Sequence, residues 1–564
     1  MPTALLLDTD ADGSHRWLHF DRPRRVLVAR RLDEVATVLD AVADAAEQGL
    51  WAVGYLAYEA APAVDPTLPG LPPDAEAPPL AWWALFDQPS ASSPTPRWAA
   101  TADLDRTTLD WRPQTTADEH RARVEAVREH IAAGDTYQAN LTFPLVATID
   151  PSLDPLDLFA RLQTAQQAPY AAYLDLDSHA LVSVSPELFF EQDGDHLRSR
   201  PMKGTARRGR FPSEDAERKA ELRSVKNRAE NVMIVDMIRN DLGRVARPGT
   251  VVVDRLFAEE TYPTVHQLVS DVRAETDADP VAVLRALFPC ASITGAPKRR
   301  TMELLGRLEE RPRGVYTGAI GRIGPSRRAR LSVAIRTVTV DRRHRRATYG
   351  VGGGIVWDSN AEDEWHECRT KARVLGRRPH RFELLETLRW QPRSGYFLLD
   401  RHLDRLVASA RFFDFRCRRE SLRERLLDAT AHLDRRRAGR HRVRLRLSRD
   451  GEARIDIESF PCAGRQTWNV LLDDRPVDDQ NPQLFHKTTD RSIYDEALAR
   501  HPAADEVLLF NPRGHLTEGT RTNLVLRFGD RFLTPPIASG LLAGTYRGAL
   551  VDRGRLHVAE LPIR

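Results

Sequence analysis

A short basic stretch near residue 380 constrains the fold of this chain more than any other feature. Residues 376–382 read Gly-Arg-Arg-Pro-His-Arg-Phe, and strand and helix patterns begin afresh after them. A chain of 564 residues is too long for a single hydrophobic core. We therefore predict two units, 1–375 and 382–564, joined by a linker at 376–381. Within the first unit, 1–115 is predicted to be an N-terminal part and 116–375 the core.

Apolar periodicity predicts a mixed α/β structure for the first unit. Helices are expected over 32–48 and 118–133, the second capped by Thr115 or Thr116. Residues 213–239 read as one long helix with a buried second half, and a further helix begins near Ala361. Strand-like runs recur along the unit, at 51–59, 136–144, 181–191, 330–340 and 346–357.

Lys203 stands in a short, loop-like segment, Pro201-Met-Lys-Gly-Thr205. A lysine becomes a nucleophile only when burial or a neighbouring positive charge favours its neutral amine. Taken alone, the segment is more typical of a surface turn that carries an ordinary lysine.

Three glutamates have the pattern of a site for a hard cation. Glu364 and Glu367 share a helix face with Lys371, and Glu230 heads an apolar helical stripe. One or two carboxylates commonly hold Mg²⁺ together with oxygens of a substrate. A solvated helix face is the alternative for Glu364 and Glu367.

A glycine-rich strand is the second candidate for ligand binding. In Tyr349-Gly-Val-Gly-Gly-Gly-Ile355, backbone N–H groups can closely approach an anion, although the order of a dinucleotide fingerprint is absent. Arg336, on the preceding strand, can clamp a carboxylate. A buried structural arginine remains the alternative.

Composition excludes several classes of function. The chain has 83 basic and 80 acidic residues, so it lacks the charge of a nucleic-acid-binding protein. No apolar run reaches the ~18 residues of a membrane span, and the N-terminus does not read as a signal peptide. The four cysteines show no metal-binding spacing. A cytoplasmic protein with no nucleic-acid or membrane partner is expected.

An ordered series of motifs spans about residues 50–375. It resembles the chorismate-utilising enzymes and, within them, component I of aminodeoxychorismate synthase. The motifs that carry the resemblance are Gly54–Glu59, Gly134–Asn140, Ser185–Leu188, Pro201–Thr205, Arg228–Asn231, Asp236–Asp241, Thr264–His266, Ser292–Lys298, Tyr316–Gly318, Ala334–Thr337 and Gly350–Glu367.

The resemblance implies a layered αββα sandwich and a role for each matching residue. Glu230, Glu364 and Glu367 correspond to a Mg²⁺ site that gathers a carboxylate of chorismate, and Glu187 to the general acid for the leaving hydroxyl. The other matching positions correspond to substrate-binding residues: His266, Thr294, Arg336, Tyr349, Gly352, Gly353 and Lys371.

The residue type at position 203 distinguishes two activities within this family. Anthranilate synthases, which are similar in most of these motifs, generally carry alanine at this position. Aminodeoxychorismate enzymes carry lysine, which is thought to attack the ring and form an adduct that ammonia displaces. No glutamine amidotransferase module is visible in this chain, so the resemblance implies a separate amidotransferase subunit as the source of ammonia.

The second unit resembles class IV aminotransferases, a pyridoxal-phosphate fold that includes aminodeoxychorismate lyase. The carrying segments are Phe382–Leu388, Arg401–Leu406, His486–Thr489, Leu516–Thr520 with Asn523-Leu524, and Gly540–Arg547. Lys487 corresponds to the lysine that binds the cofactor, Glu518 to the partner of the pyridine nitrogen, and Arg405, Gly544 and Thr545 to phosphate ligands. The unit is shorter at its C-terminus than most members.

The leading hypothesis is a fused enzyme of p-aminobenzoate formation for folate biosynthesis. Its first unit would make 4-amino-4-deoxychorismate, and its second would release p-aminobenzoate and pyruvate. Three alternatives stay open: an anthranilate synthase component, the same amination in an antibiotic pathway, and a second unit that serves only for assembly. A homodimer through the second unit is a further expectation.

Overall fold

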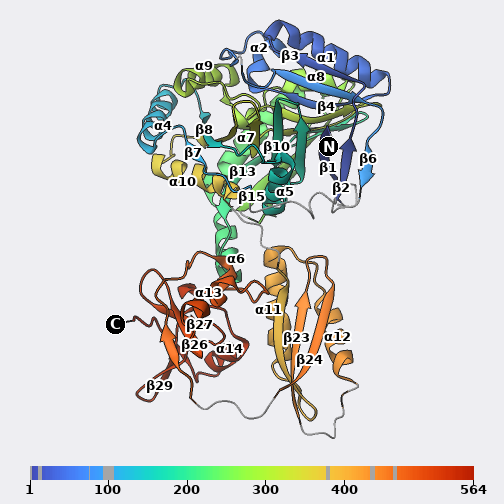
Figure 1. The fold of residues 1–564 in the computed structure, drawn as a ribbon. Helices are drawn as coiled ribbons and strands as arrows, with labels where there is room; N and C mark the ends of the chain where they lie inside the picture. The colour runs from blue at the N-terminus through green and yellow to red at the C-terminus, as the bar shows by residue number, and fades with distance from the viewer. Residues whose placement is uncertain are drawn as a thin grey trace. The chain divides into compact units, whose positions relative to one another are not determined.

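The computed structural model divides the chain into two compact units (Figure 1). The residues it describes are 3–9, 15–74, 76–92, 107–263, 265–376, 382–431, 433, 439–460 and 467–563. One unit comprises residues 1–207 and 219–379, and the other comprises 208–218 and 380–564. The predicted division differs from these units at one place, because residues 208–218 group with the second unit.

Two antiparallel sheets of ten strands form the centre of the first unit. The first sheet runs β16-β8-β20-β19-β10-β9-β1-β2-β6, with β7 paired to β8. Its strands are β1 (Ala4–Thr9), β2 (His15–Phe20), β6 (Ser90–Ser92), β7 (Arg112–Pro113), β8 (Gln138–Thr148), β9 (Tyr170–Asp175), β10 (His179–Ser185), β16 (Gly295–Ala296), β19 (Thr337–Asp341) and β20 (Arg346–Ile355).

The second sheet runs β13-β15-β12-β11-β18-β17-β4-β5-β3, with β14 paired to β15. Its strands are β3 (Arg25–Ala29), β4 (Trp51–Leu56), β5 (Ala81–Phe86), β11 (Leu188–Asp193), β12 (His196–Arg200), β13 (Met202–Arg207), β14 (Val252–Thr261), β15 (Val265–Glu275), β17 (Ala319–Gly324) and β18 (Arg328–Val333).

Helices cover the outer faces of both sheets, which confirms the predicted αββα layering. One core cluster joins the sheets, with Leu6 and Phe20 of the first sheet and Tyr55 of the second. Others pack helices against each sheet. The helices of this unit are α1 (Leu32–Glu47), α2 (Ala61–Val64), α4 (Ala117–Ala132), α5 (Pro155–Gln166), α7 (Val225–Gly243), α8 (Pro280–Leu287), α9 (Lys298–Glu309) and α10 (Ala361–Ala372), with the short turns η1 (Tyr58–Ala60), η2 (Ala291–Ile293) and η3 (Arg373–Leu375). Helix α6 (Pro212–Glu221) lies mostly within the residues that group with the second unit.

Two predicted helices agree closely with the structure for clear physical reasons. Helix α1 buries Val35, Leu39 and Val42, which recur at helical spacing. Helix α4 begins at a capping box, in which the Thr116 side chain accepts a hydrogen bond from the Glu119 N–H.

The predicted strand over 181–191 is wrong, because the chain there forms two strands in different sheets. Strand β10 ends at Ser185 and β11 begins at Leu188, so Pro186 and Glu187 make the crossing. The chain crosses again between β18 and β19, where Arg336 has a left-handed φ of 50°. Two predicted site residues therefore lie where the chain changes sheets.

Two other local predictions are wrong. The loop-like segment around Lys203 is strand β13, which pairs with β15. The single helix over 213–239 is broken into α6 and α7, because the Ser224 side chain accepts a hydrogen bond from the Asn227 N–H and starts a new helix.

The second unit contains three small sheets. A four-stranded sheet, β22-β21-β23-β24, packs against α11 and α12 through a core that includes Leu403, Leu426 and Val443. Two three-stranded sheets follow, β25-β26-β27 and β28-β29-β30. The elements are β21 (Leu384–Gln391), β22 (Gly395–Tyr396), α11 (Leu399–Phe413), α12 (Arg419–Ala431), β23 (Arg440–Leu447), β24 (Ala453–Phe460), β25 (Val470–Leu472), η4 (Pro482–Leu484), α13 (Ser492–Arg500), β26 (Glu506–Phe510), β27 (Leu516–Gly519), β28 (Leu526–Phe528), β29 (Arg531–Thr534), η5 (Ile537–Ser539), α14 (Thr545–Asp552) and β30 (His557–Val558).

Residues 208–218 are part of this unit through specific contacts. The Phe211 ring packs on Phe485 with centroids 5.2 Å apart, and the Arg208 guanidinium lies 4.3 Å from the Phe412 ring centroid. Sequence periodicity holds no signal for such long-range packing.

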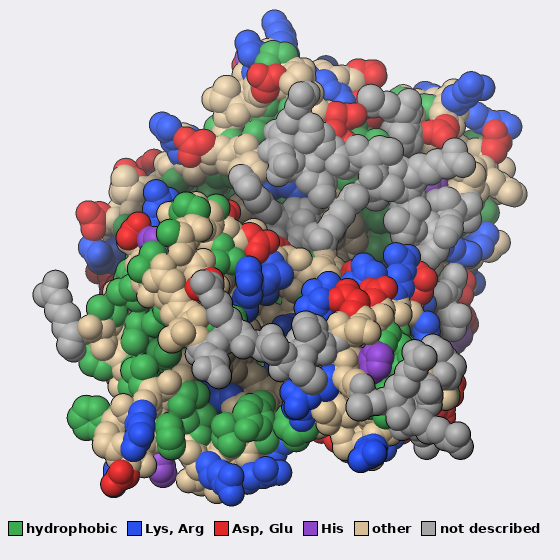
Figure 2. All heavy atoms as spheres, turned by 60° about the horizontal axis from the view of Figure 1, so that its bottom comes forward, with side chains coloured by type: hydrophobic (Ala, Val, Ile, Leu, Met, Phe, Trp, Pro, Cys, Tyr) green, Lys and Arg blue, Asp and Glu red, His purple; other side chains and the backbone are tan. Residues whose placement is uncertain are grey.

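The last sheet of the second unit exposes apolar side chains. Leu526, Phe528, Phe532 and Val558 are all at least 38% exposed. Figure 2 shows hydrophobic side chains gathered on one side of the face it presents. Among the residues that the structure describes, no helix is long and apolar enough to cross a membrane.

Candidate active site

A cavity of about 280 Å³ in the first unit brings together most of the residues singled out by sequence. Its walls come from both sheet crossings, from β13 and β20, and from α7 and α10. The predicted residues that line it are Glu187, Lys203, Glu230, Arg336, Tyr349, Gly352, Glu364, Glu367 and Lys371.

Three other predicted residues do not line the cavity. His266 is buried in β15 and hydrogen-bonds Thr261, and its neighbour Gln267 lines the cavity instead. Thr294 is fully buried, and its hydroxyl donates to backbone carbonyl oxygens of Cys290 and Ala291. Gly353 lies behind the wall, against the Glu364 carboxylate.

Glu187 is held at the first sheet crossing as a buried carboxyl group. The Ser292 hydroxyl donates to its Oε1 over 2.6 Å, and the backbone N–H of Glu187 donates to the Ser185 hydroxyl over 3.2 Å. Burial raises the pKa of the Glu187 carboxyl to about 7, although the Ser292 hydrogen bond and the charge of Lys203 oppose the rise. A carboxyl with this pKa can donate a proton near neutrality.

Lys203 lies at an irregularity in β13. The register between β13 and β15 shifts between Met202 and Thr205, and Gly204 has a φ of 90° that favours glycine. A bulge of this kind re-aims side chains, and here it places Lys203 in the cavity wall. The Asn231 amide of α7 donates to the Lys203 carbonyl oxygen over 3.5 Å.

Glycine at position 354 leaves the space that the Lys203 amine occupies. A Cβ on Gly354 would lie 2.1 Å from the Lys203 Nζ. The glycine-rich strand β20 therefore serves to admit side chains from other elements. At Gly350 the occupant is the Tyr316 ring, which would be 2.2 Å from a Cβ there.

Helix α10 carries the predicted carboxylates into the cavity. The Ser359 hydroxyl donates to Glu364 Oε1 over 2.6 Å, and burial with the nearby Glu367 carboxylate raises the pKa of Glu364 above its ordinary value. Lys371 pairs with Glu367 at 2.8 Å and donates to the Gly352 carbonyl oxygen over 2.8 Å. Burial would lower the pKa of Lys371, but Glu367 raises it.

These carboxylates suit a cation that is shared with a substrate. Within the described part of the chain, no three His, Cys, Asp or Glu side chains form a metal cluster by themselves. Mg²⁺ needs only one or two protein carboxylates when substrate oxygens and waters complete its shell. The crowded pair of Glu364 and Glu367 fits that arrangement, with Glu230 on another wall of the cavity.

Two further residues of the cavity wall are suited to an anion. Arg336 is buried, and its guanidinium donates to the Gln166 amide oxygen over 3.4 Å. Tyr349 is fully buried, its hydroxyl donates to the Lys371 carbonyl oxygen over 3.3 Å, and burial raises its pKa to about 12. The neutral phenol of Tyr349 and the guanidinium of Arg336 beside it can both hydrogen-bond a carboxylate.

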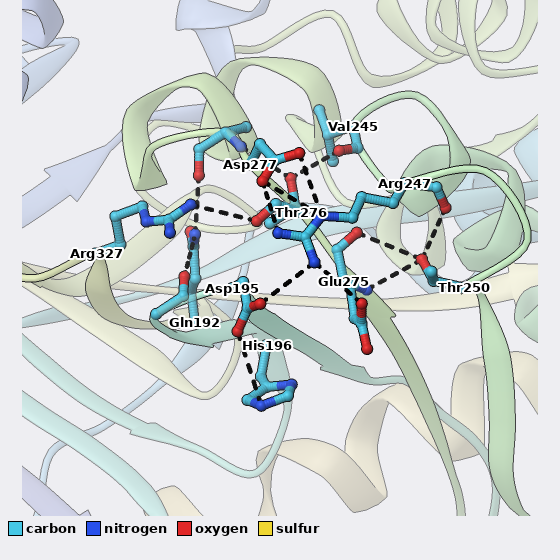
Figure 3. A network of polar contacts seen from close by, with 12 residues as sticks. Gln192, Asp195, His196, Val245, Arg247, Thr250, Glu275, Thr276, Asp277 and Arg327 are labelled. Carbon is cyan, nitrogen blue, oxygen red and sulfur yellow. Dashed lines mark hydrogen bonds and ion pairs between the residues drawn. The ribbon is translucent and has the colours of Figure 1, made fainter.

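A network of ion pairs joins the segment after α7 to the end of β15 (Figure 3). Arg247, which follows α7, pairs with Asp195, Glu275 and Asp277. The Thr276 hydroxyl donates to the Val245 carbonyl oxygen over 2.6 Å. The C-terminal end of α7 is thereby tied to the end of β15.

Sequence reasoning missed several residues that support the site. Ser292 holds Glu187, Ser359 holds Glu364, and Asn231 contacts the backbone of Lys203. Asn140 and Gln267 also line the cavity. These residues lie within the quoted motifs or beside them. The partners of Ser292 and Asn231 are 105 and 28 positions away, so only the fold reveals those two pairs. Ser359 is 5 positions from Glu364, so that pair lies within one motif.

The second unit brings its predicted residues into one neighbourhood. Burial lowers the pKa of the Lys487 amine, and the positive charge of Arg405 lowers it further, while Glu518 acts in the opposite direction. Glu518 accepts hydrogen bonds from the Tyr494 hydroxyl, the Asn523 amide and the Leu542 N–H. Burial raises the pKa of Glu518 to about 8.

A second group of contacts surrounds the predicted phosphate ligands. Arg405 makes a bidentate pair with Glu386 at 2.8 and 2.7 Å and donates to the Ala543 carbonyl oxygen over 3.1 Å. His402 bridges Glu386 and the Thr545 hydroxyl. Arg405 and His402 outweigh burial and lower the pKa of Glu386 to about 2.

These residues fit pyridoxal phosphate. Gly544 precedes α14, and a Cβ there would lie 1.8 Å from the Asn523 Oδ1, so only glycine fits at this position. The start of α14, with Thr545, offers N–H and hydroxyl donors for a phosphate, and Lys487 and Glu518 supply an amine and a carboxyl group.

Two family models match the chain. Residues 7–377 match the chorismate binding enzyme family, and residues 383–563 match amino-transferase class IV. The second match confirms the class IV character of the second unit.

Curated relatives match about half of the chain. An aminodeoxychorismate synthase of Streptomyces griseus is 46% identical over 45% of this chain and 35% of its own length. An aminodeoxychorismate synthase component 1 of Salmonella typhimurium is 41% identical over 48% of this chain and 60% of its own length. The chain thus spans less than two thirds of these relatives.

Solved structures show the same fold in the first unit. Anthranilate synthase component I of Streptococcus pneumoniae aligns with a TM-score of 0.54 at 23% identity, over 67% of this chain and 91% of that protein. Identity at this level supports the fold and no closer relation.

Proposed function

The chain belongs to the chorismate binding enzyme family, and from that premise we propose that its first unit converts chorismate and ammonia to 4-amino-4-deoxychorismate. The observation that carries the proposal is the meeting of Lys203 and Glu187 in one cavity with Arg336. An amine nucleophile, a proton donor and a carboxylate ligand are what such an amination needs. Two curated aminodeoxychorismate synthases are 46% and 41% identical to this chain over 45% and 48% of its length.

The proposed reaction has two displacements at one ring carbon. The Lys203 amine attacks, the bond from that carbon to the hydroxyl oxygen breaks, and Glu187 gives its proton so that water leaves. Ammonia then attacks the same carbon, and the Lys203 amine departs. The ring keeps its pyruvyl ether and gains an amine. Splitting one difficult displacement into two is the usual benefit of a covalent intermediate.

The remaining cavity residues orient the substrate. Arg336 and Tyr349 bind one carboxylate of chorismate, and the Gly352 backbone narrows the wall beside it. Glu364 and Glu367, with Glu230, would hold Mg²⁺, which supplies positive charge for a substrate carboxylate. Lys371 holds Glu367 in place through their ion pair.

A separate amidotransferase subunit is proposed to supply the ammonia from glutamine. One similar protein is named component 1 of its synthase, and free ammonium should replace the partner in vitro. A cytoplasmic location is part of the same proposal.

For the second unit we propose release of p-aminobenzoate and pyruvate from the product of the first. Lys487 would hold pyridoxal phosphate and move protons on the substrate, Glu518 would hydrogen-bond the pyridine nitrogen, and Arg405, Gly544 and Thr545 would bind the phosphate. The cofactor, when bound, acts as an electron sink for carbon chemistry. The exposed apolar sheet of β28, β29 and β30 supports a homodimer through this unit.

The test supplies the purified protein with chorismate, Mg²⁺ and ammonium and identifies the products by mass spectrometry. We expect aminodeoxychorismate and, with pyridoxal phosphate added, p-aminobenzoate. Anthranilate as the product would overturn the proposal for the first unit. Aminodeoxychorismate that accumulates in the presence of pyridoxal phosphate would favour a second unit that serves only for assembly. The identity of the neighbouring genes would show whether a folate pathway or an antibiotic pathway uses the product.

A further inference from the structure

Gln138 is a buried amide that the proposed reaction leaves without a role. It begins strand β8, and its side chain is fully buried. Neither its Oε1 nor its Nε2 has a hydrogen-bond partner among the residues that the structure describes. A buried polar group without a partner destabilises the fold, so two such atoms in one side chain need a nearby polar group.

The Lys203 amine is the polar group that shares this space. A Cβ placed on Gly354 would lie 2.1 Å from the Lys203 Nζ and 2.8 Å from the Gln138 Nε2. Both side chains therefore reach the space beside Gly354 that only glycine leaves open. Gln138 also shares a strand face with Asn140, which lines the cavity, while Gln138 itself lies behind the wall.

We propose that Gln138 is a positioning residue that accepts a hydrogen bond from the Lys203 amine and turns its lone pair toward the cavity. The inference rests on the proposed function, because it specifies how the nucleophile of that reaction is aimed. A half-turn of the amide exchanges Nε2 and Oε1 with little change of shape, which brings the acceptor to the amine.

The neutrality of Gln138 is as important as its position. Glu187 and Glu364 both interact with the charge of Lys203, and Glu230 and Lys371 line the same cavity. A further carboxylate behind the amine would favour its protonated form, which has no lone pair. An amide oxygen can orient the amine without adding a charge.

The test uses the full chain with two substitutions at this position. Gln138→Leu keeps the volume but removes the acceptor, and Gln138→Glu keeps an acceptor but adds charge. Gln114→Leu is the matched control, because Gln114 is exposed and follows the edge strand β7. Melting temperatures of all variants establish that each is folded.

The first readout is synthesis of aminodeoxychorismate with ammonium. We expect Gln138→Leu to lower kcat about 10- to 100-fold with little change in the KM for chorismate, since a misaimed nucleophile affects chemistry more than binding. We expect Gln138→Glu to shift the pH profile of kcat to higher pH. Unchanged kcat and an unchanged pH profile in both variants would overturn the proposal.

The second readout does not depend on synthase activity. Trace labelling with acetic anhydride, followed by mass spectrometry, measures the reactivity of Lys203 against pH, with Lys219 as the internal reference. We expect the labelling curve of Lys203 to move to higher pH in Gln138→Glu, with Lys219 unmoved. A wild-type protein that makes no aminodeoxychorismate but shows this shift would overturn the proposed function and keep the pairing. A curve that does not move would overturn the pairing whatever the activity.

Discussion

Lys203 and Lys487 are the two lysines to which we assign amine roles in the proposed function, and their surroundings differ. Lys203 lies at a strand bulge in a cavity wall, where Glu187 and Glu364 interact with its charge. Lys487 lies in a loop before α13, where burial and the positive charge of Arg405 lower its pKa. In the proposed roles, the two sites differ in how the lysine amine would be made reactive. One relies on placement beside a proton donor, and the other on removal from water beside a cation.

Replacement of Lys203 is the largest expected effect and tests one side of the comparison. Lys203→Ala should lower synthesis of aminodeoxychorismate at least about 10³-fold, because the first displacement loses its nucleophile. The measurement is product formation from chorismate and ammonium, with Lys219→Ala as the control. Cofactor binding by the second unit should be unaltered. Full synthase activity in Lys203→Ala would remove Lys203 from the mechanism.

Replacement of Lys487 tests the other side. Lys487→Ala should abolish the visible absorbance of a lysine-bound cofactor and the release of p-aminobenzoate, while aminodeoxychorismate still forms. Absorbance titration with pyridoxal phosphate and product analysis measure the two effects. A variant that releases p-aminobenzoate at the wild-type rate would show that Lys487 is not the lysine that holds the cofactor.

The next effect concerns the proton donor beside Lys203. With a pKa of about 7, the Glu187 carboxyl is protonated below pH 7 and loses its proton as the pH rises, so kcat should fall on the alkaline side. Glu187→Gln should lower kcat about 10²-fold and remove this alkaline fall. Assays from pH 6 to 9 measure both, and an alkaline fall that persists in Glu187→Gln would assign it to another group.

The smallest expected effect comes from Ser292. Its hydrogen bond to Glu187 lowers the pKa of that carboxyl. Ser292→Ala should therefore raise the pKa of Glu187 and move the alkaline fall in kcat to higher pH, at a cost of about 1 kcal/mol in stability. A shift toward lower pH would contradict the role given to Ser292.

The sequence predicted the parts of this fold that depend on local pattern. Helices α1 and α4 follow from apolar spacing and from the Thr116 cap. The break before α7 was missed because apolar periodicity continues through Ser224, whose cap becomes visible only in the structure. The division of the predicted strand 181–191 at Glu187 was missed, because the strand-like alternation of side chains continues where the chain passes from one sheet to the other.

Sequence reasoning singled out the motif residues that line the cavity. It did not find the residues that support them from distant parts of the sequence. Glu364, Glu367 and Lys371 follow from helical spacing, and Arg336 from its place on the strand before the glycine-rich run. The family resemblance added Glu187. Gln138 and Gly354 are 216 positions apart, and only the pairing of β8 with β20 brings them near Lys203. The grouping of 208–218 with the second unit likewise depends on tertiary packing.

The most direct test of the central role of Lys203 is the mass of the protein during turnover. The protein is mixed with chorismate and Mg²⁺ without ammonium, quenched, digested and analysed by mass spectrometry. The account predicts that the peptide with Lys203 gains the mass of chorismate minus one water, and that added ammonium removes this adduct. An unmodified Lys203 peptide in a preparation that makes aminodeoxychorismate when ammonium is supplied would contradict it.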